Sequence, residues 1–489
     1  MACHRLSNRP ADYSTPPAVV MSSTTPPGSD SDGAETPAES SGPGALDPLT
    51  ALLREVEGTS NGASTESNDA METPTSDLPP PPSEANGKRR KKVRKPKPRW
   101  LKITAVVIAV LLVLPLISFT KAMITTQNLS FAERGAEWMR DNHLGGVLNT
   151  VESWWLSNNQ PKEGGDPNRA IDVPVTGDGG PTTTVKVIAP HLPAPTNVQV
   201  PEGVTPVANE GVWQPVGPLV GGAQTMYTTQ VRPDSVHTSI LDGLVWIDPK
   251  LVTLEVFPGS EEPGGKWAKP SQVPMDRRLA LIAAFNGGFR MDDAKGGFYL
   301  DGVTQRPLRD GAASFVTYSD GTATVGQWGR DVVMSPEVAA VRQNLDLIID
   351  NGGGPPNPGG GPAAAAAPGA LVPGLVDNVD GKWGATFGNK VYAWRSAVGV
   401  TATGAIVYGY GDGLSSLSLA NLMLRAGCVR AMQLDINTVW TTFNFYNSTR
   451  FLDPTSVQGT KLLPESFKGA NRYLSPDARD FVGVFTRAL

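Results

Sequence analysis

An aspartate, an arginine and an asparagine are the side chains best placed for chemistry, because each interrupts or ends an apolar segment. Asp435 lies in Ala431-Met432-Gln433-Leu434-Asp435-Ile436-Asn437. A strand with period two would put the apolar residues on one face and Gln433, Asp435 and Asn437 on the other. One carboxylate flanked by two amides can act as a base or stabilise positive charge. Capping a turn or pairing with a cation is the alternative role for Asp435.

Arg395 lies in a segment that is typical of a hairpin. Val391–Thr401 and Ala405–Tyr410 read as strands joined by Ala402-Thr403-Gly404. The neighbours of Arg395 on its own face are all small, namely Ala393, Ala397 and Gly399. Room beside a guanidinium favours an anion, since arginine can hold a phosphate through two hydrogen bonds. A salt bridge at a sheet edge is the alternative.

Asn286 ends the apolar run Leu279–Phe285 and is followed by Gly287 and Gly288. This pattern predicts a buried strand that delivers one polar side chain to its end. The two glycines would let a ligand approach the backbone closely. An ordinary Asn-Gly turn is the competing interpretation.

A second carboxylate has several candidates in the segment MDDAKGGFYLDG, residues 291–302. Asp301-Gly302 is typical of a hairpin turn, and Asp301, Asp292 or Asp293 could also reach a substrate. No paired Cys or His stand at ligand spacing, so we expect no metal site and no cofactor, with weak binding of a divalent cation left open at the acidic stretch. No Gly-x-Ser-x-Gly elbow and no Walker loop is present, which argues against serine hydrolases and NTPases.

The order of these segments resembles the phosphodiester glycosidase family, whose best-known member removes a capping N-acetylglucosamine from mannose 6-phosphate. The family motifs are Asn-Gly-Gly-Phe, then Arg-x-Ala-x-Gly, then Leu-Asp-Gly-Gly-Gly-Ser. In this chain they read Asn286-Gly287-Gly288-Phe289, Arg395-Ser396-Ala397-Val398-Gly399 and Leu434-Asp435. The chain resembles a membrane-anchored bacterial branch of that family.

The resemblance implies a hydrolase that cleaves a sugar-1-phosphodiester, with a glycan or sugar phosphate as substrate. Asp435 would be the catalytic carboxylate, Arg395 would hold the phosphate, and Asn286 would orient sugar hydroxyls. The expected substrate-binding residues are Gly287, Gly288, Asn437, Asp301 and Gln433.

The chain departs from the family pattern directly after Asp435. Where the family has Gly-Gly-Gly-Ser, this chain has Ile436-Asn437-Thr438-Val439. The glycines that would let a substrate approach the backbone are gone. A catalytically altered glycan-binding or scaffold protein on the same fold is therefore the alternative function, and Val439 or Trp440 filling the site would favour it.

A membrane anchor is predicted at residues 100–121. The stretch Ile103–Phe119 is apolar apart from Thr104 and Ser118, which is long enough to span a bilayer. Ten basic residues lie in Lys88–Lys102, so the positive-inside rule places the N-terminus in the cytoplasm and the C-terminal domain outside. A cleaved secretory signal is the rival interpretation. We expect a single-pass protein of the cytoplasmic membrane, part of the cell envelope.

Composition divides the rest of the chain. Residues 1–99 are rich in Ser, Thr, Pro and acidic residues and are expected to form a disordered cytoplasmic tail. Residues 122–160 read as an amphipathic, Trp-rich helical stalk that could bind a protein partner, and residues 161–205 as a Pro/Gly-rich linker. Residues 206–489 are expected to form the domain that resembles the phosphodiester glycosidases, with a low-complexity loop at 352–373.

We expect an α+β (mixed α/β) fold, a sheet-dominated ectodomain with packed helices behind one transmembrane helix. Nucleic acid is not an expected partner, because the chain after residue 102 holds 29 basic and 34 acidic side chains. Cys3 and Cys428 lie on opposite sides of the predicted span and should not pair. Cys428 is expected to be a buried structural thiol.

Overall fold

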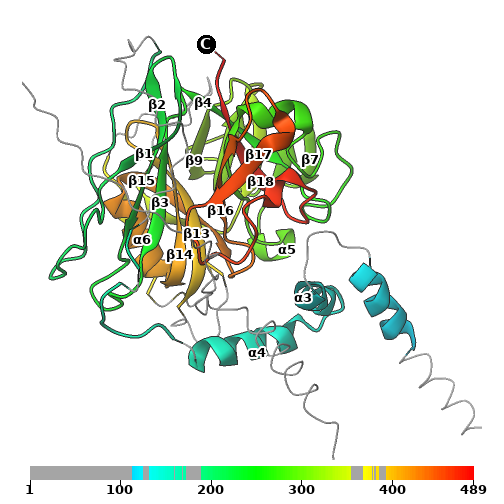
Figure 1. Cartoon of the computed structure of the whole chain (residues 1–489). Helices are drawn as coiled ribbons and strands as arrows, with labels where there is room; N and C mark the ends of the chain where they lie inside the picture. Colours follow the sequence, from blue (N-terminus) through cyan, green and yellow to red (C-terminus); the bar gives the residue numbers. More distant parts are fainter. Residues whose placement is uncertain are drawn as a thin grey trace, which may run out of the picture. The chain divides into compact units, whose positions relative to one another are not determined.

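The computed structural model describes residues 113–124, 131–158, 160–167, 169–171, 189–353, 367–376, 378, 382–384 and 392–488. All of these residues fall in one unit of the chain, Pro43–Leu489. Among them the structure is dominated by strands, which gather into three sheets (Figure 1). The predicted α+β class is therefore confirmed at that level.

The largest sheet has eight strands, and every neighbouring pair in it is antiparallel. In spatial order these are β1 (Gln214–Val220), β2 (Ala223–Val231), β3 (Asp242–Ile247), β14 (Ile406–Leu414), β13 (Ala393–Thr401), β15 (Cys428–Ile436), β11 (Leu347–Asp350) and β12 (Ala370–Leu371). Adjacent central strands come from distant parts of the chain, so β13 brings its residues next to those of β15.

Two further antiparallel sheets have five strands each. One contains β17 (Val457–Lys461), β16 (Phe443–Ser448), β5 (Leu281–Asn286), β18 (Phe481–Thr486) and β4 (Val252–Phe257). The other contains β7 (Val303–Arg306), β6 (Phe298–Leu300), β10 (Val338–Gln343), β8 (Ala313–Tyr318) and β9 (Ala323–Gln327).

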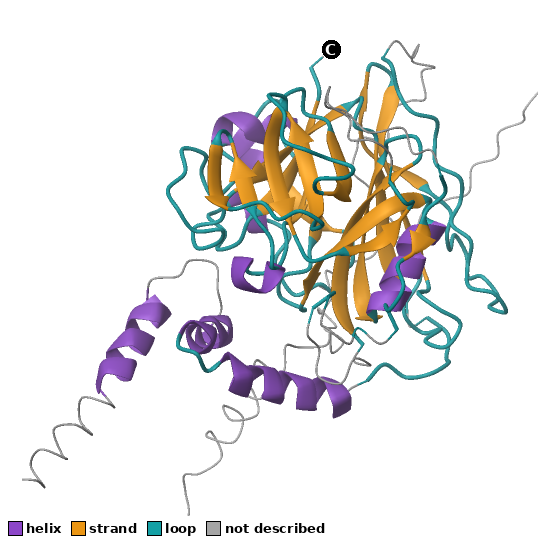
Figure 2. Cartoon of the chain, turned by 180° about the vertical axis from the view of Figure 1, so that it is seen from behind, coloured by secondary structure: helices purple, strands orange, loops and turns teal. Residues whose placement is uncertain are grey.

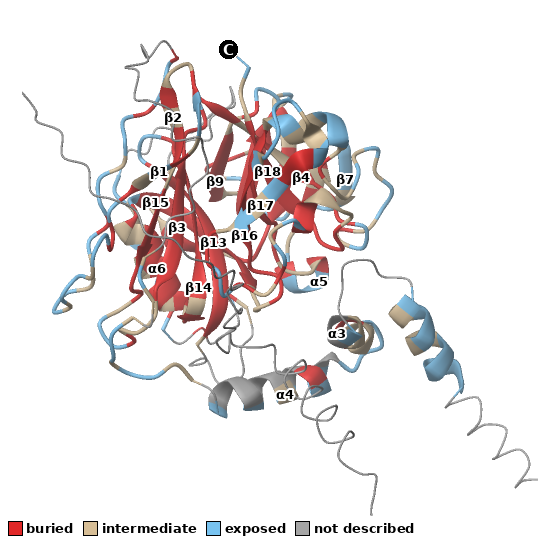
Figure 3. Ribbon diagram, in the orientation of Figure 1, coloured by how far each residue is buried: buried red, intermediate tan, exposed pale blue. Residues whose placement is uncertain are grey.

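The main core receives apolar side chains from all three sheets, for example Tyr408, Phe285 and Phe315. The ring of Phe285 lies 5.0 Å from that of Tyr408 and 6.3 Å from that of Phe315, which joins one strand of each sheet. Figure 3 shows that buried residues are concentrated in these strands. The central strands β13 and β15 are buried along almost their whole length, as strands covered on both faces are.

Helix α6 (Ser416–Arg425) covers the other face of the large sheet (Figure 2). The sequence predicts a helix from Ser416 to about Arg425 with Gly427 as its C-cap, and the observed bounds confirm it. The Ser415 side chain accepts a hydrogen bond from the Ser418 backbone N–H, and the Ser418 side chain accepts one from the Ser415 backbone N–H. Gly427 ends the segment in the left-handed region at a φ of 88°. Cys428 follows and is buried, as predicted, and burial raises the pKa of its thiol.

The remaining helical segments are α3 (Phe131–Asp141), α4 (Gly145–Asn158), the short α5 (Met291–Ala294), and the 3-10 turns η1 (Met275–Ala280), η2 (Pro454–Ser456) and η3 (Arg472–Leu474). Helices α3 and α4 both lie within the predicted stalk 122–160, and the non-helical residues 142–144 separate them. The prediction of a loop at 352–373 is wrong for two residues. Ala370 and Leu371 form strand β12, because their backbone pairs with that of Asp350 and Ile349. Residues 354–366 of that loop lie outside the described residues.

Within the described part of the chain, no helix combines the length and the apolar character needed to cross a membrane. Residues 100–112 of the predicted span 100–121 lie outside the described residues, as does the whole predicted tail 1–99.

Candidate functional site

Asn286 closes β5 and is held inside the domain by three hydrogen bonds. Its Oδ1 accepts from the Tyr408 hydroxyl at 2.7 Å and from the Thr442 N–H at 3.2 Å. Its Nδ2 donates to the Ser396 Oγ at 3.1 Å. These bonds join β5 to β13 and β14 across the sheet interface and fix the direction of the amide.

Ser396 connects Asn286 to Asp435. Its Oγ accepts from the Asn286 amide and also from the Asp435 backbone N–H at 3.2 Å. Two of the predicted site residues, from β5 and β15, therefore meet through one hydroxyl of β13. Sequence reasoning missed Ser396, although its place beside Arg395 in the second motif was a signal for it.

The Asp435 carboxyl is almost entirely buried, with 4% of the residue exposed. Its Oδ1 accepts from the Ile436 N–H at 2.8 Å. Burial raises the pKa of Asp435 to about 6, while the positive charges of Arg479, Arg140 and Arg342 act in the opposite direction. A carboxyl with this pKa changes its charge near neutral pH, as a catalytic acid or base must.

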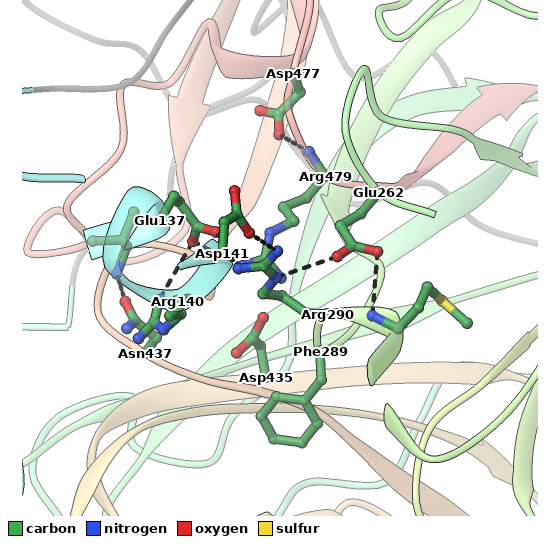
Figure 4. A network of polar contacts seen from close by, with 12 residues as sticks. Glu137, Arg140, Asp141, Glu262, Phe289, Arg290, Asp435, Asn437, Asp477 and Arg479 are labelled. Atoms are coloured by element: carbon green, nitrogen blue, oxygen red, sulfur yellow. Dashed lines mark hydrogen bonds and ion pairs between the residues drawn. The ribbon is translucent and has the colours of Figure 1, made fainter. Parts of the chain in front are cut away.

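Period two predicts that Gln433 and Asp435 lie on the same face of their strand and have the same surroundings. A β-bulge in β15 explains why they do not. Arg395 pairs with Ile436 and Ala397 with Gln433, so β15 contains one extra residue across this interval. Such a bulge re-aims the side chains beside it. Figure 4 shows the Asp435 carboxyl pointing toward a cluster that contains Arg290 and Arg479.

Arg395 and Gln433 contact each other in the interior. The Arg395 Nε donates to the Leu414 carbonyl at 2.7 Å, and one terminal nitrogen donates to Gln433 Oε1 at 3.1 Å. Gln433 Nε2 in turn donates to the Trp383 carbonyl at 2.7 Å. Burial lowers the pKa of Arg395 to about 10. The structure therefore places this arginine among internal hydrogen bonds, while other arginines supply the charges that act on Asp435.

The two glycines after Asn286 make room for protein atoms. A Cβ on Gly287 would lie 2.0 Å from Asp480 Oδ2, and one on Gly288 would lie 3.0 Å from a terminal nitrogen of Arg342. Asp480 and Arg342 form a buried ion pair at 2.8 Å. The close backbone approach predicted for a ligand is thus occupied by this pair.

A methyl group at position 287 should therefore destabilise the fold. We expect Gly287→Ala to lower the free energy of unfolding by roughly 1–3 kcal/mol, as overpacking usually does. Gly469→Ala is the matched control, because nothing lies within 4 Å of its added Cβ. Urea unfolding of both variants measures the difference, and equal midpoints would contradict this reading of the turn.

Beside Asp435, the carboxylate of Glu137 on helix α3 is held by two arginines, Arg290 and Arg479 (Figure 4). Both arginines belong to the part of the chain that forms the three sheets, which is called the sheet domain below. Glu137 Oε1 accepts from Arg479 at 3.0 Å, and its Oε2 accepts from Arg290 at 3.0 Å. Arg140 adds an ion pair to Oε1 at 3.3 Å. Burial alone would raise the pKa of Glu137, but these three arginines hold it below its usual value.

Arg290 also contacts two further carboxylates, Asp141 at 2.5 Å and Glu262 at 3.3 Å. Sequence reasoning missed Arg290, Arg479 and Glu137. Arg290 directly follows the Asn-Gly-Gly-Phe motif, which was a usable signal, whereas Glu137 and Arg479 are single charged residues in unremarkable surroundings.

Two of the predicted substrate-binding residues, Asn437 and Asp301, have partners within the protein. Asn437 Oδ1 accepts from the Val439 N–H at 2.7 Å and forms a turn after β15. Asp301 lies in the left-handed region at a φ of 47°, in the β6–β7 turn, and its exposed carboxylate faces Lys269 Nζ at 3.8 Å. Asp301 thus takes the hairpin position and pairs with Lys269 instead of joining the Asp435 cluster. Across the described ranges, no group of three or more His, Cys, Asp or Glu could hold a metal ion.

No protein-family model matches the chain, and no curated protein matches it. Solved structures give distant similarity. The catalytic domain of zebrafish N-acetylglucosamine-1-phosphodiester alpha-N-acetylglucosaminidase, auto-inhibited by pro-peptide, aligns with a TM-score of 0.32 and 14% identity over 54% of this chain and 82% of that one. A hypothetical protein from Synechocystis aligns with a TM-score of 0.29 and 14% identity over 54% of this chain and 63% of that one.

A putative exported protein from Burkholderia pseudomallei aligns with a TM-score of 0.24 and 16% identity over 50% of this chain and 74% of that one. With these TM-scores and identities, the similarities establish neither a shared fold nor a shared activity.

Proposed function

We propose that the chain is an extracytoplasmic hydrolase, anchored by residues 100–121, that cleaves a sugar-1-phosphodiester linkage in an envelope glycan. The observation that carries the proposal is the environment of Asp435. Burial raises the pKa of its carboxyl to about 6, and positive charge from Arg479, Arg140 and Arg342 acts on it. A carboxylate beside arginines suits a substrate that joins a sugar to an anion.

The proposed reaction needs one base and one group that accepts negative charge. Water attacks the anomeric carbon, Asp435 takes the proton of that water, and the bond from the anomeric carbon to the phosphate oxygen breaks. The electron pair leaves with the oxygen as a phosphate monoester. Because this leaving group is already a stabilised anion, a separate general acid is dispensable.

Asn286 is assigned an orienting role. Its amide is fixed by Tyr408, Thr442 and Ser396. Through Ser396 it supports the backbone N–H of Asp435, so it holds the strand end that carries the carboxyl. Arg395 and Gln433 brace the same strand through their own hydrogen bond.

The test is release of free sugar from a panel of sugar-1-phosphodiesters by the purified full-length chain, with the Asp435→Asn variant measured beside it. Release by the parent and its loss in the variant would support the hydrolase and its carboxylate together. Full activity of a folded Asp435→Asn protein would exclude the assigned role.

The second function is a glycan-binding or scaffold protein, and one observation favours it. Val439, the last residue of the altered segment, and Trp440, which follows it, are buried and pack with Ala478. The family that this chain resembles has a glycine-rich segment at this place. In this chain the segment contributes Val439 to a small apolar cluster. Retained binding of the same phosphodiesters without release of sugar would favour this function.

A further inference from the structure

We infer that Arg290 and Arg479 form a phosphoryl-binding subsite, and that the Glu137 carboxylate now occupies the position of the bound anion. The identity of the ligand as the phosphoryl group of a phosphodiester rests on the proposed function. The subsite itself rests on the contacts of the three side chains.

The first argument is the geometry of the occupant. The two oxygens of Glu137 are divided between the two arginines, each at 3.0 Å. A phosphodiester also presents two equivalent oxygens that share one negative charge. Arginine binds both groups through the same N–H···O geometry, so a phosphoryl group can replace the carboxylate without a change of net charge.

The second argument is that part of the support of each arginine comes from outside α3, although Asp141 of α3 also pairs with Arg290. Glu262 contacts the Arg290 Nε at 3.3 Å. The backbone N–H of Arg479 donates to Asp477 Oδ1 at 3.0 Å. The subsite therefore keeps part of its support when Glu137 is absent, as a binding site for an external anion requires.

Trp440 supplies a surface on which Arg479 rests. The Arg479 guanidinium lies 4.5 Å from the centre of the Trp440 ring, and that of Arg472 lies 5.1 Å from it. Arg472 is fixed in turn by Asp477 through bonds of 2.5 and 3.0 Å. Cation–π contacts of this kind restrict the guanidinium plane while leaving its N–H groups free to donate to an anion in that plane.

The third argument is the position of the subsite relative to Asp435. Figure 4 shows the Asp435 carboxyl pointing toward the guanidinium groups of Arg290 and Arg479, and Arg479 is the charge that most lowers the pKa of this carboxyl. A phosphoryl group on Arg479 would therefore lie close to the carboxyl that the proposed reaction uses as its base. Binding of the anion also requires that Glu137 leave, which couples ligand binding to the contact between α3 and the sheet domain.

Inorganic phosphate is the probe, titrated calorimetrically into the purified full-length chain. Glu137→Gln removes the competing charge and should tighten phosphate binding at least about tenfold, equivalent to about 1.4 kcal/mol. Phosphate should also raise the melting temperature of Glu137→Gln more than that of the parent, because a ligand stabilises the state that it binds. Glu255→Gln is the matched control, since Glu255 pairs with Arg277 outside this cluster.

A second change tests the arginines in the Glu137→Gln background. Arg479→Gln should abolish the gain in phosphate affinity. Arg479→Lys keeps the positive charge but loses the planar guanidinium that can donate two parallel hydrogen bonds, so it should retain part of the gain. Arg277→Gln in the same background is the control and should change nothing. Unchanged phosphate affinity in Glu137→Gln, or full affinity after Arg479→Gln, would overturn the subsite.

The two proposals fail in distinguishable ways. Phosphate binding with this pattern, but no release of sugar from any phosphodiester, would leave the subsite intact and remove the proposed reaction. Release of sugar that depends on Asp435, with phosphate affinity indifferent to Glu137 and Arg479, would support the reaction and place the phosphate elsewhere.

Discussion

Replacing Asp480 with Ala is expected to lower the free energy of unfolding by about 3–5 kcal/mol, the largest stability effect that we predict. Asp480 and Arg342 form an ion pair at 2.8 Å in which 1% of the Arg342 side chain and none of the Asp480 side chain is exposed. Removing one partner leaves the other charge buried and unpaired. The same residue accepts the Gly287 N–H through its backbone at 2.9 Å, so the pair braces the turn after Asn286.

Two further variants decide whether burial causes the effect. Asp292→Ala breaks an exposed pair with Arg306, in which 77% of the Asp292 side chain is exposed, and should cost less than about 1 kcal/mol. The double variant Arg342→Met with Asp480→Ala should be more stable than Asp480→Ala alone, because no charge then remains unpaired. Denaturant unfolding measures all three. Equal losses for Asp480→Ala and Asp292→Ala would contradict the argument.

The sequence was most informative where structure depends on neighbouring residues. Helix α6 was predicted from Ser416 to about Arg425, because Gly427 is a local stop signal, and the structure adds the Ser415 cap at its start. The prediction that Asn286 ends a buried strand is confirmed for the same reason. Strands β16 and β18 were missed, since β16 pairs with β5 and β18 pairs with β4 and β5, which are segments far from them in the chain.

The candidate site was predicted only in part. Asp435 and Asn286 lie on strands whose pattern could be read, and the structure joins them through Ser396. The bulge in β15 could not be foreseen, because it depends on the register with β13. The pairing of Glu137 with Arg479 spans 342 positions of the chain and has no local signature.

The largest expected effect on activity comes from Asp435→Asn, which should slow sugar release by roughly 10²–10⁴-fold, the usual contribution of a positioned acid or base. The amide keeps the size of the side chain but cannot take a proton from water. Initial rates of sugar release by parent and variant, at equal concentrations of folded protein, measure the loss.

The pH dependence of the parent follows from the same residue. A base must be ionised to act, and burial raises the pKa of Asp435 to about 6. Activity should therefore be low below that pH and rise as the pH passes through about 6. The residual activity of Asp435→Asn should lack this rise. A rise of the same shape in the variant would assign the titration to another group and exclude Asp435 as the base.

Stability should respond in the opposite direction, which separates catalysis from folding. Because burial raises the folded-state pKa of Asp435 above its unfolded value, its contribution to stability is present at low pH and is lost as the pH rises through about 6. Asp435→Asn carries no such charge and should be at least as stable as the parent at pH values well above 6.

Asp412→Asn provides the matched control, because burial also raises the pKa of Asp412 to about 6 and its carboxyl accepts from the Gly413 N–H at 2.7 Å. Both variants should be stable above that pH, but only Asp435→Asn should lose activity. Equal loss of activity in the two variants would indicate a general effect of removing a buried charge. Loss confined to Asp435→Asn would mark its carboxyl as the group that the reaction needs, since the two residues then differ in position and not in chemistry.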